Sequence, residues 1–218
     1  HTYEEPLRHA PPFGVTTELD MLSMPELMIP LRRKVAESSA FADVRSPSVG
    51  LTLPDGHPHQ LLEEGEGDPS WPVATTVDEV PAFVEDRIAE GADYLKVLVE
   101  DGHVFGTSLA VLDPELITAM VREGHARDRL VLSHAMTVDA ADLSVDAGVD
   151  ALTHLFFDRP HTEELVEKIA AADVFVISTL TVIASITGEP AGAELAKDRR
   201  VSSKLPPAWV DNLSGAFG

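Results

Sequence analysis

The 218-residue sequence predicts an α/β fold in which helices cover a parallel β-sheet. Two observations support this class. Short β-rich runs alternate with segments of helical spacing, and strand–helix–strand alternation with short turns is typical of parallel sheets. The β-rich runs are also apolar along their length, as expected of strands that are buried on both faces.

Five runs rich in β-branched and aromatic residues are the expected strands. In chain order they are 14–21 (GVTTELDM), 93–99 (DYLKVLV), 129–135 (RLVLSHA), 151–157 (ALTHLFF) and 174–182 (VFVISTLTV). Each is bounded by segments that contain turn-forming or helix-forming residues, so these runs set the order of the predicted sheet.

Helices are expected between these strands, at 77–92, 113–128, 138–150 and 161–173. The first has its apolar residues on one helical face and meets a usual stop signal at Gly91. The second begins with Asp113 as the expected N-cap and Pro114 at the first helical position. The other two show weaker versions of the same pattern.

The segment 46–76 differs from its surroundings. It is rich in proline, glycine and acidic residues, which predicts a long loop over one end of the sheet. Long loops inside compact domains are often functional. Because no internal repeat or linker divides the sequence, we expect one domain over 1–218.

The composition excludes several classes of function. The formal net charge of −21 argues against partners that present phosphates, so neither nucleic acid nor an anionic membrane surface is expected. No apolar run is long enough to span a bilayer. The absence of cysteine excludes disulfides and thiolate zinc sites. The opening residues lack the pattern of a secretory signal, and we predict a cytoplasmic location.

Three consecutive predicted strands each carry one polar residue that an apolar strand does not need: Lys96, His134 and His154. Functional residues collect at the carboxyl ends of parallel strands. Imidazoles on neighbouring strands can converge on one metal ion at about 2.0–2.1 Å from each nitrogen. A buried histidine is most often only hydrogen-bonded, so the spacing alone leaves both readings open.

The motifs GADYLKV, LSHA and GVDALTHLFFD resemble consecutive barrel strands of the metal-dependent amidohydrolase superfamily, in particular its imidazolonepropionase-like and prolidase-like branch. FGVTTELDM is similar to the second strand of that branch and VFVISTLT to the seventh. The resemblance implies a (β/α)₈ TIM-type barrel with strands two to seven present. The eighth strand and the family's small β-sandwich have no counterpart, so we expect the central part, or a fragment, of a longer enzyme.

The resemblance also implies a metal centre. In many members a lysine on strand four is carboxylated by CO2 and bridges two divalent metals, and Lys96 matches it. Burial supports this role, because it lowers the pKa of an amine and leaves it nucleophilic. The histidines of strands five and six match His134 and His154, and His1 matches the second member of the first-strand His-x-His pair. Two zinc ions are expected, although manganese, cobalt or iron would also suit these ligands.

The catalytic residue is left unassigned. In the family, an aspartate at the end of strand eight takes the proton of the attacking water. Nothing in this chain matches that strand, and neither Asp198 nor Asp211 is given the role.

Three further histidines are candidates for substrate contact. His57 and His59 lie in the long loop, where they could touch substrate or polarise the carbonyl that is cleaved; a turn with exposed histidines is the alternative. His103 follows Lys96 in the segment EDGHVFG, together with Glu100 and Asp101. These residues could shape specificity, and ordinary loop polarity is the alternative.

The implied function is hydrolysis of an amide, cyclic amide or dipeptide-type C–N bond by metal-activated hydroxide, on a small-molecule or dipeptide-like substrate. Two alternatives stay open. One is a Schiff-base lyase or aldolase that uses Lys96, and the other is a catalytically inactive barrel fragment with a binding or scaffold role. An incomplete barrel would have open strand edges, which predicts association into homo-oligomers.

Overall fold

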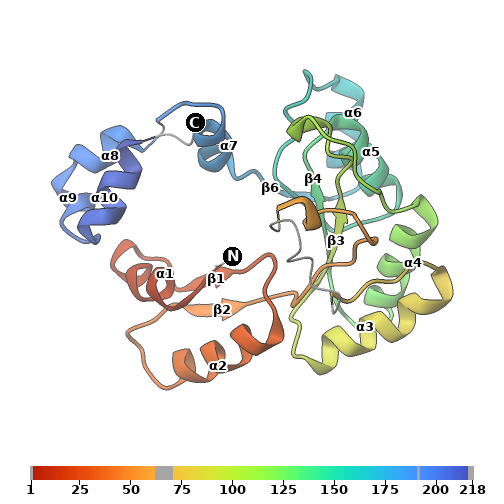
Figure 1. The fold of residues 1–218 in the computed structure, drawn as a ribbon, viewed down its shortest axis with the longest axis horizontal. Helices are drawn as coiled ribbons and strands as arrows, with labels where there is room; N and C mark the ends of the chain where they lie inside the picture. The colour runs from red at the N-terminus through yellow and green to blue at the C-terminus, as the bar shows by residue number, and fades with distance from the viewer. Residues whose placement is uncertain (1, 62–70, 191, 216–218) are drawn as a thin grey trace.

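The computed structural model describes residues 2–61, 71–190 and 192–215. Its strands form two parallel sheets (Figure 1). The first sheet pairs β1 (Thr17–Leu19) with β2 (Asp43–Arg45), and the second has the order β3 (Leu95–Val99), β4 (Val131–Ala135), β5 (Ala151–Thr153) and β6 (Phe175–Ile177). The α/β class with parallel strands is therefore confirmed.

The segment that follows β2 pairs with β3 through an isolated bridge. Leu51 pairs in parallel with Val97: its N–H donates to the Lys96 carbonyl at 2.8 Å, and its own carbonyl accepts from the N–H of Leu98 at 3.0 Å. The strands thus follow one another in space as they do in sequence, which is the order a barrel requires. The described residues form no closed barrel, and the eight-stranded barrel remains a prediction.

The helices alternate with the strands as far as β6, and after β6 the described residues form helices without further strands. They are α1 (Glu4–His9), α2 (Pro25–Ala36), α3 (Val80–Ala89), α4 (Pro114–His125), α5 (Val138–Asp146), α6 (Glu163–Ala171), α7 (Leu180–Ile186), α8 (Ala193–Lys197), α9 (Arg199–Ser202) and α10 (Pro207–Ser214). Short 3-10 turns lie at Pro11–Phe13, His59–Leu61, Val77–Glu79 and His103–Phe105. The four helices expected from the sequence correspond to α3, α4, α5 and α6.

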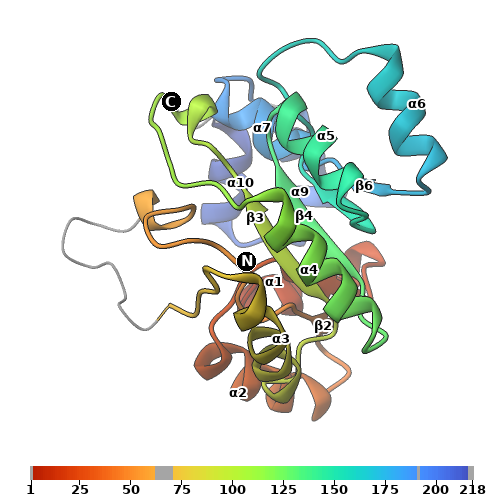
Figure 2. The ribbon, with the colours of Figure 1, turned by 90° about the vertical axis from the view of Figure 1, so that its right-hand side faces the viewer.

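The two faces of the β3–β6 sheet differ. Helices α3, α4 and α5 cover one face (Figure 2), and the main apolar core lies beneath them, with Leu95 and Val97 of β3 packed against Ile117 of α4. Side chains alternate along a strand, so Tyr94, Lys96 and Leu98 point to the opposite face. Tyr94 forms a second apolar cluster there with Leu132 and Ala151.

All five predicted strands are shorter in the structure than expected, and two of them end well before the predicted position. The run 151–157 ends as a strand at Thr153, and the run 174–182 ends at Ile177, after which α7 begins at Leu180. The cause is local backbone geometry. His154 has φ = 77° and Thr179 has φ = 46°, a left-handed conformation that cannot continue a strand.

The N-terminal part has its own small core, formed by Leu7 of α1, Met28 and Val35 of α2, and Ala42 and Val44 beside and within β2. The last helices return to this part of the molecule (Figure 1). Lys204 Nζ donates to the Pro12 carbonyl at 2.9 Å, and the Trp209 ring lies 5.3 Å from that of His9. Among the helices described, none has the length and apolarity needed to cross a bilayer.

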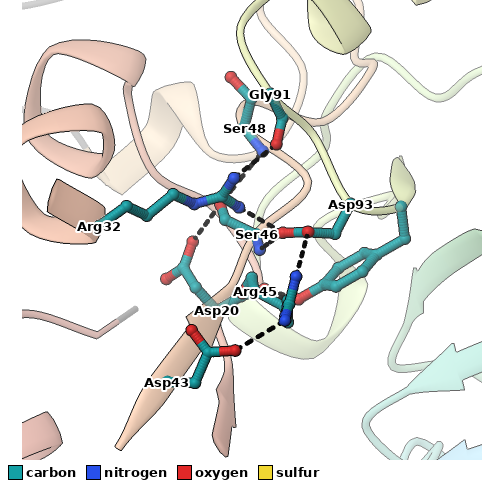
Figure 3. A network of polar contacts seen from close by, with 9 residues as sticks. Asp20, Arg32, Asp43, Arg45, Ser46, Ser48, Gly91 and Asp93 are labelled. Atoms are coloured by element: carbon teal, nitrogen blue, oxygen red, sulfur yellow. Dashed lines mark hydrogen bonds and ion pairs between the residues drawn. The ribbon is translucent and has the colours of Figure 1, made fainter. Parts of the chain in front are cut away.

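A polar network centred on Asp93 joins this N-terminal part to the start of β3 (Figure 3). Arg32 of α2 binds the Asp93 carboxylate and donates to the Gly91 carbonyl at 2.6 Å. Arg45 Nη1 and the Ser46 N–H donate to the same carboxylate at 3.2 and 2.9 Å. Asp93 therefore ties α2, β2 and β3 together at the amino end of the strand.

Candidate metal and substrate site

Lys96 lies at the centre of the candidate site. It is the second residue of β3, is 3% exposed, and points away from the helices. No hydrogen bond or ion pair joins its amine to any described residue. Burial lowers the pKa of Lys96 to about 7, although the nearby Asp20 carboxylate favours the charged form. A substantial fraction of the amine is therefore uncharged near neutral pH, as a reactive lysine requires.

His134 occupies the neighbouring strand, β4, where it pairs in register with Leu98 of β3. Its ring is buried, and its Nε2 lies 3.1 Å from Oε2 of Glu100. Burial lowers the pKa of His134 well below its usual range, and the charges of His57 and Lys96 act in the same direction. The imidazole is therefore neutral at physiological pH, which is the form that binds metals.

His154 follows β5 directly rather than lying inside the strand as expected. Its Nδ1 lies 2.7 Å from Oγ1 of Thr179, the residue that precedes α7. Both residues have positive φ, and such strain in non-glycine residues often marks functional positions. Burial, followed by the charges of His134 and Lys96, lowers the pKa of His154 to about 3.

These three residues lie close together. The rings of His134 and His154 meet edge to face with centroids 4.8 Å apart, and the charge of Lys96 acts on both rings. Lys96 and His134 lie on the same face of the adjacent parallel strands β3 and β4, and His154 follows the end of the next strand, β5. The structure thus assembles an amine and two neutral imidazoles at one place.

This donor set fits a divalent metal ion only in part. Within the described chain, His134 Nδ1 and His154 Nε2 make no hydrogen bonds, so each ring keeps one nitrogen available for an ion. No group of three or more histidine, aspartate or glutamate side chains in the described residues is arranged as a metal site. A carboxylated Lys96 would add the missing oxygen ligands. His1, the fourth expected ligand, lies outside the described residues.

His57 is the predicted substrate residue that comes nearest to these groups. Its ring stacks on His134 with centroids 4.5 Å apart and lies parallel to Phe105 at 6.2 Å. Gln60 Nε2 lies 2.7 Å from its Nδ1, and burial lowers the pKa of His57. The alternative of an exposed turn histidine is therefore wrong for His57.

The other two predicted substrate residues lie farther out. His59 is half-buried and contacts Trp71 edge to face at 5.8 Å. His103 is exposed, and its backbone N–H donates to Asp101 Oδ1 at 2.8 Å. Burial raises the pKa of the nearby Glu100, and the charge of His103 acts in the opposite direction.

Two carboxylates at the site were not predicted as partners of the metal-binding residues: Glu100 was named only as a residue that could shape specificity, and Asp20 was not named. Glu100 is 2% exposed and contacts His134 directly. The two-residue strand period could have revealed it, because it places Glu100 on the same face as Lys96 and Leu98. Asp20 is also buried, directly after β1, and accepts from the Ser46 hydroxyl at 2.9 Å and the Thr2 N–H at 2.9 Å.

Several solved structures resemble this chain over most of its length. An Xaa-Pro dipeptidase aligns with a TM-score of 0.64 and 20% identity, over 90% of this chain and 50% of that one. The ochratoxinase of A. niger gives 0.67 and 20%, over 96% and 48%. Phenylurea hydrolase B gives 0.65 and 25%, over 79% and 44%. The chain thus spans about half the length of these proteins.

Comparison of the sequence alone gives no counterpart: no protein-family model and no curated protein matches it. The likeness to known proteins is therefore one of structure. The solved structures that share this fold also include an enzyme described as an amidohydrolase, which is 23% identical and of which this chain covers 51%.

Proposed function

We propose that this chain forms the metal-binding part of a hydrolase that cleaves an amide, cyclic amide or dipeptide-type C–N bond. The observation that carries the proposal is the meeting of a buried, partly neutral Lys96 with two neutral imidazoles, His134 and His154. The similar solved structures are themselves named as a dipeptidase, an ochratoxinase and a phenylurea hydrolase, which agrees with hydrolysis as the class of reaction.

In this proposal Lys96 is carboxylated by CO2 and offers two oxygens, while His134 Nδ1 and His154 Nε2 offer nitrogens. His1 would complete the set. Two divalent ions held there, zinc by preference, would supply Lewis-acid activation of water and of the substrate carbonyl. The uncharged state of both imidazoles favours this role, since a protonated ring cannot bind a cation.

His57 would serve the substrate rather than the metal. With Gln60 donating to its Nδ1, the ring carries its proton on Nε2 and can donate a hydrogen bond. Its low pKa keeps it uncharged, so it would orient a polar substrate group without repelling the cations. His59 and His103 remain proposed contacts for the more distant parts of a small substrate.

A Schiff-base lyase or aldolase is the second candidate. A pKa of about 7 for Lys96 also suits imine formation with a carbonyl substrate. Borohydride trapping with such a substrate separates the two functions, because a carboxylated lysine cannot form an imine. A stable mass increase on Lys96 would support the lyase and contradict the hydrolase.

The test of the hydrolase proposal is metal content. The full chain is incubated with zinc and bicarbonate, dialysed, and analysed for bound metal, and then assayed on a panel of N-acyl amino acids and dipeptides. We expect stoichiometric zinc that is lost in His134→Ala, His154→Ala and Lys96→Ala. The control is His125→Ala, which removes an exposed histidine of α4.

Zinc binding that is absent from the wild-type chain, or that survives all three substitutions, would contradict the metal site. In that case an inactive scaffold role, in which the fold persists without the chemistry, becomes the better explanation. Folding of each variant is checked by circular dichroism, so that metal loss is not mistaken for unfolding.

A further inference from the structure

We propose that Glu100 is a positioning residue: it holds Nε2 of His134 and thereby presents Nδ1 of that ring to the metal. This inference rests on the proposed function, which supplies the metal. It goes beyond that function because Glu100 is assigned no part in it, and the strand motifs gave no reason to single it out.

The contact between Glu100 and His134 is buried on both sides. The two side chains are 1% and 6% exposed, and Oε2 of Glu100 lies 3.1 Å from His134 Nε2. Burial raises the pKa of Glu100; in its ionised form the carboxylate only accepts hydrogen bonds, which places the proton of the ring on Nε2. The lone pair of the imidazole then lies on Nδ1, the nitrogen that no described residue engages.

The Glu100 carboxylate is itself fixed. Its other oxygen, Oε1, accepts from the Gly102 N–H at 2.8 Å. Gly102 has φ = 82°, and a Cβ there would lie 2.8 Å from Thr107 Cγ2, so the turn that supplies this N–H requires glycine. The backbone thus directs one carboxylate oxygen toward Gly102 and leaves the second for His134.

The face of the His134 ring is also restrained. His57 stacks on His134 with an angle of 25° between the ring planes. Glu100 therefore restrains the edge of the ring while His57 restrains its face. Ligating histidines commonly donate their second ring N–H to a carboxylate, and the loss of such a partner typically reduces metal affinity about 10–100-fold.

The experiment compares Glu100→Gln with Asp101→Asn in the full chain. Both replace a carboxylate by an amide at adjacent positions, but Asp101 is exposed and its side chain accepts a hydrogen bond only from the His103 N–H among the described residues. Zinc affinity is measured by competition with a chromophoric chelator in the presence of bicarbonate. The tautomer of His134 is read in metal-free protein from the ¹⁵N shifts of its ring.

We expect the Nε2–H tautomer for His134 in the wild-type protein and in Asp101→Asn. In Glu100→Gln we expect a mixture of tautomers and zinc affinity lowered about 10–100-fold, with the control near the wild-type value. An Nδ1–H tautomer in the wild-type protein, or unchanged zinc affinity in Glu100→Gln, would overturn the inference.

Failure of the proposed function gives a different result. If neither the wild-type chain nor His134→Ala takes up zinc, the metal site is wrong. The tautomer measurement, which needs no metal, still decides whether Glu100 controls the ring. Should Glu100→Gln fail to fold, the wild-type tautomer alone remains decisive, because Nδ1–H would contradict the geometry.

Discussion

The start of strand β3 and the candidate site differ in how their ionisable groups are partnered. At the amino end, the Asp93 carboxylate is bound by two guanidinium groups and a backbone N–H (Figure 3). Three residues farther along the chain, Lys96 is buried and no described group pairs with its amine, and on the neighbouring strand β4 the pKa of His134 is lowered by burial. Paired charges stabilise the start of β3, whereas the candidate site contains desolvated groups.

This division is the one expected of a parallel α/β sheet. Chemistry collects at the carboxyl ends of the strands, and the amino ends contribute stability. Here a few residues of one strand separate the two. Substitutions at the start of β3 should therefore lower the free energy of unfolding without changing metal binding, whereas substitutions in the candidate site should change metal binding.

The largest effect on stability is expected from Asp93→Ala. The substitution leaves Arg32 and Arg45 without their shared partner and removes the acceptor of the Ser46 N–H. Because Asp93 is 22% exposed, water compensates in part, and we expect a loss of about 1–3 kcal/mol in the free energy of unfolding. Urea denaturation measures it.

The control for this substitution is Asp43→Ala. Asp43 is half exposed, and among the described residues its side chain contacts only Arg45, at 2.7 Å. A loss below about 1 kcal/mol is expected there. Equal losses in the two variants would mean that the Asp93 network does not stabilise the amino end of β3 more than an ordinary surface pair.

Lys96→Met is expected to raise the free energy of unfolding, whereas Asp93→Ala lowers it. Methionine has a similar length and no polar atom, so it removes the cost of burying an amine with which no described group pairs. In metal-free protein we expect the free energy of unfolding to rise by about 1–2 kcal/mol, while zinc binding is lost. Lys197→Met, at a residue whose side chain is 72% exposed, should change stability by less than about 0.5 kcal/mol.

A lower free energy of unfolding in Lys96→Met would contradict the contrast between the start of β3 and the candidate site, because it would show that the amine has a favourable partner in the folded protein. The measurement is denaturant unfolding in the presence of a chelator. The chelator matters, since bound metal would stabilise the wild-type protein by mass action and hide the effect.

The residue pattern predicted the part of the candidate site that lies on the strands. Lys96 and His134 stand out because an apolar, β-branched run has no need of them, and the alternation of faces then places them together. The α/β class follows from the same alternation of strands and helices. These features are local in sequence, which is why they could be predicted.

The remainder depends on the path of the chain between strands. The amino-acid sequence does not show that His154 and Thr179 adopt positive φ. The ends of the predicted strands 151–157 and 174–182 were therefore placed too late in the chain. The stacking of His57 on His134 joins a loop to a strand far away in sequence. Glu100 was treated as loop polarity because its burial becomes visible only when the Gly102 turn is seen in three dimensions.

The smallest effect concerns pH and another carboxyl near the amino end of β3. Burial raises the pKa of Glu90, but hydrogen bonds from Arg87 and from the Ser48 hydroxyl, at 2.6 Å, outweigh it and hold that pKa below 4.5. A carboxyl with a depressed pKa in the folded state stabilises the protein above its unfolded pKa, and this contribution is lost as the pH falls through the folded value.

Glu90→Gln should therefore lower the free energy of unfolding by less than about 1 kcal/mol at pH 7, and the difference from wild type should shrink as the pH falls below 4.5. Denaturant unfolding between pH 7 and pH 3 measures it, with Glu167→Gln, at an exposed position of α6, as the control for loss of a charge. A difference that stays constant over this range would show that Glu90 acts through its shape and not through its charge.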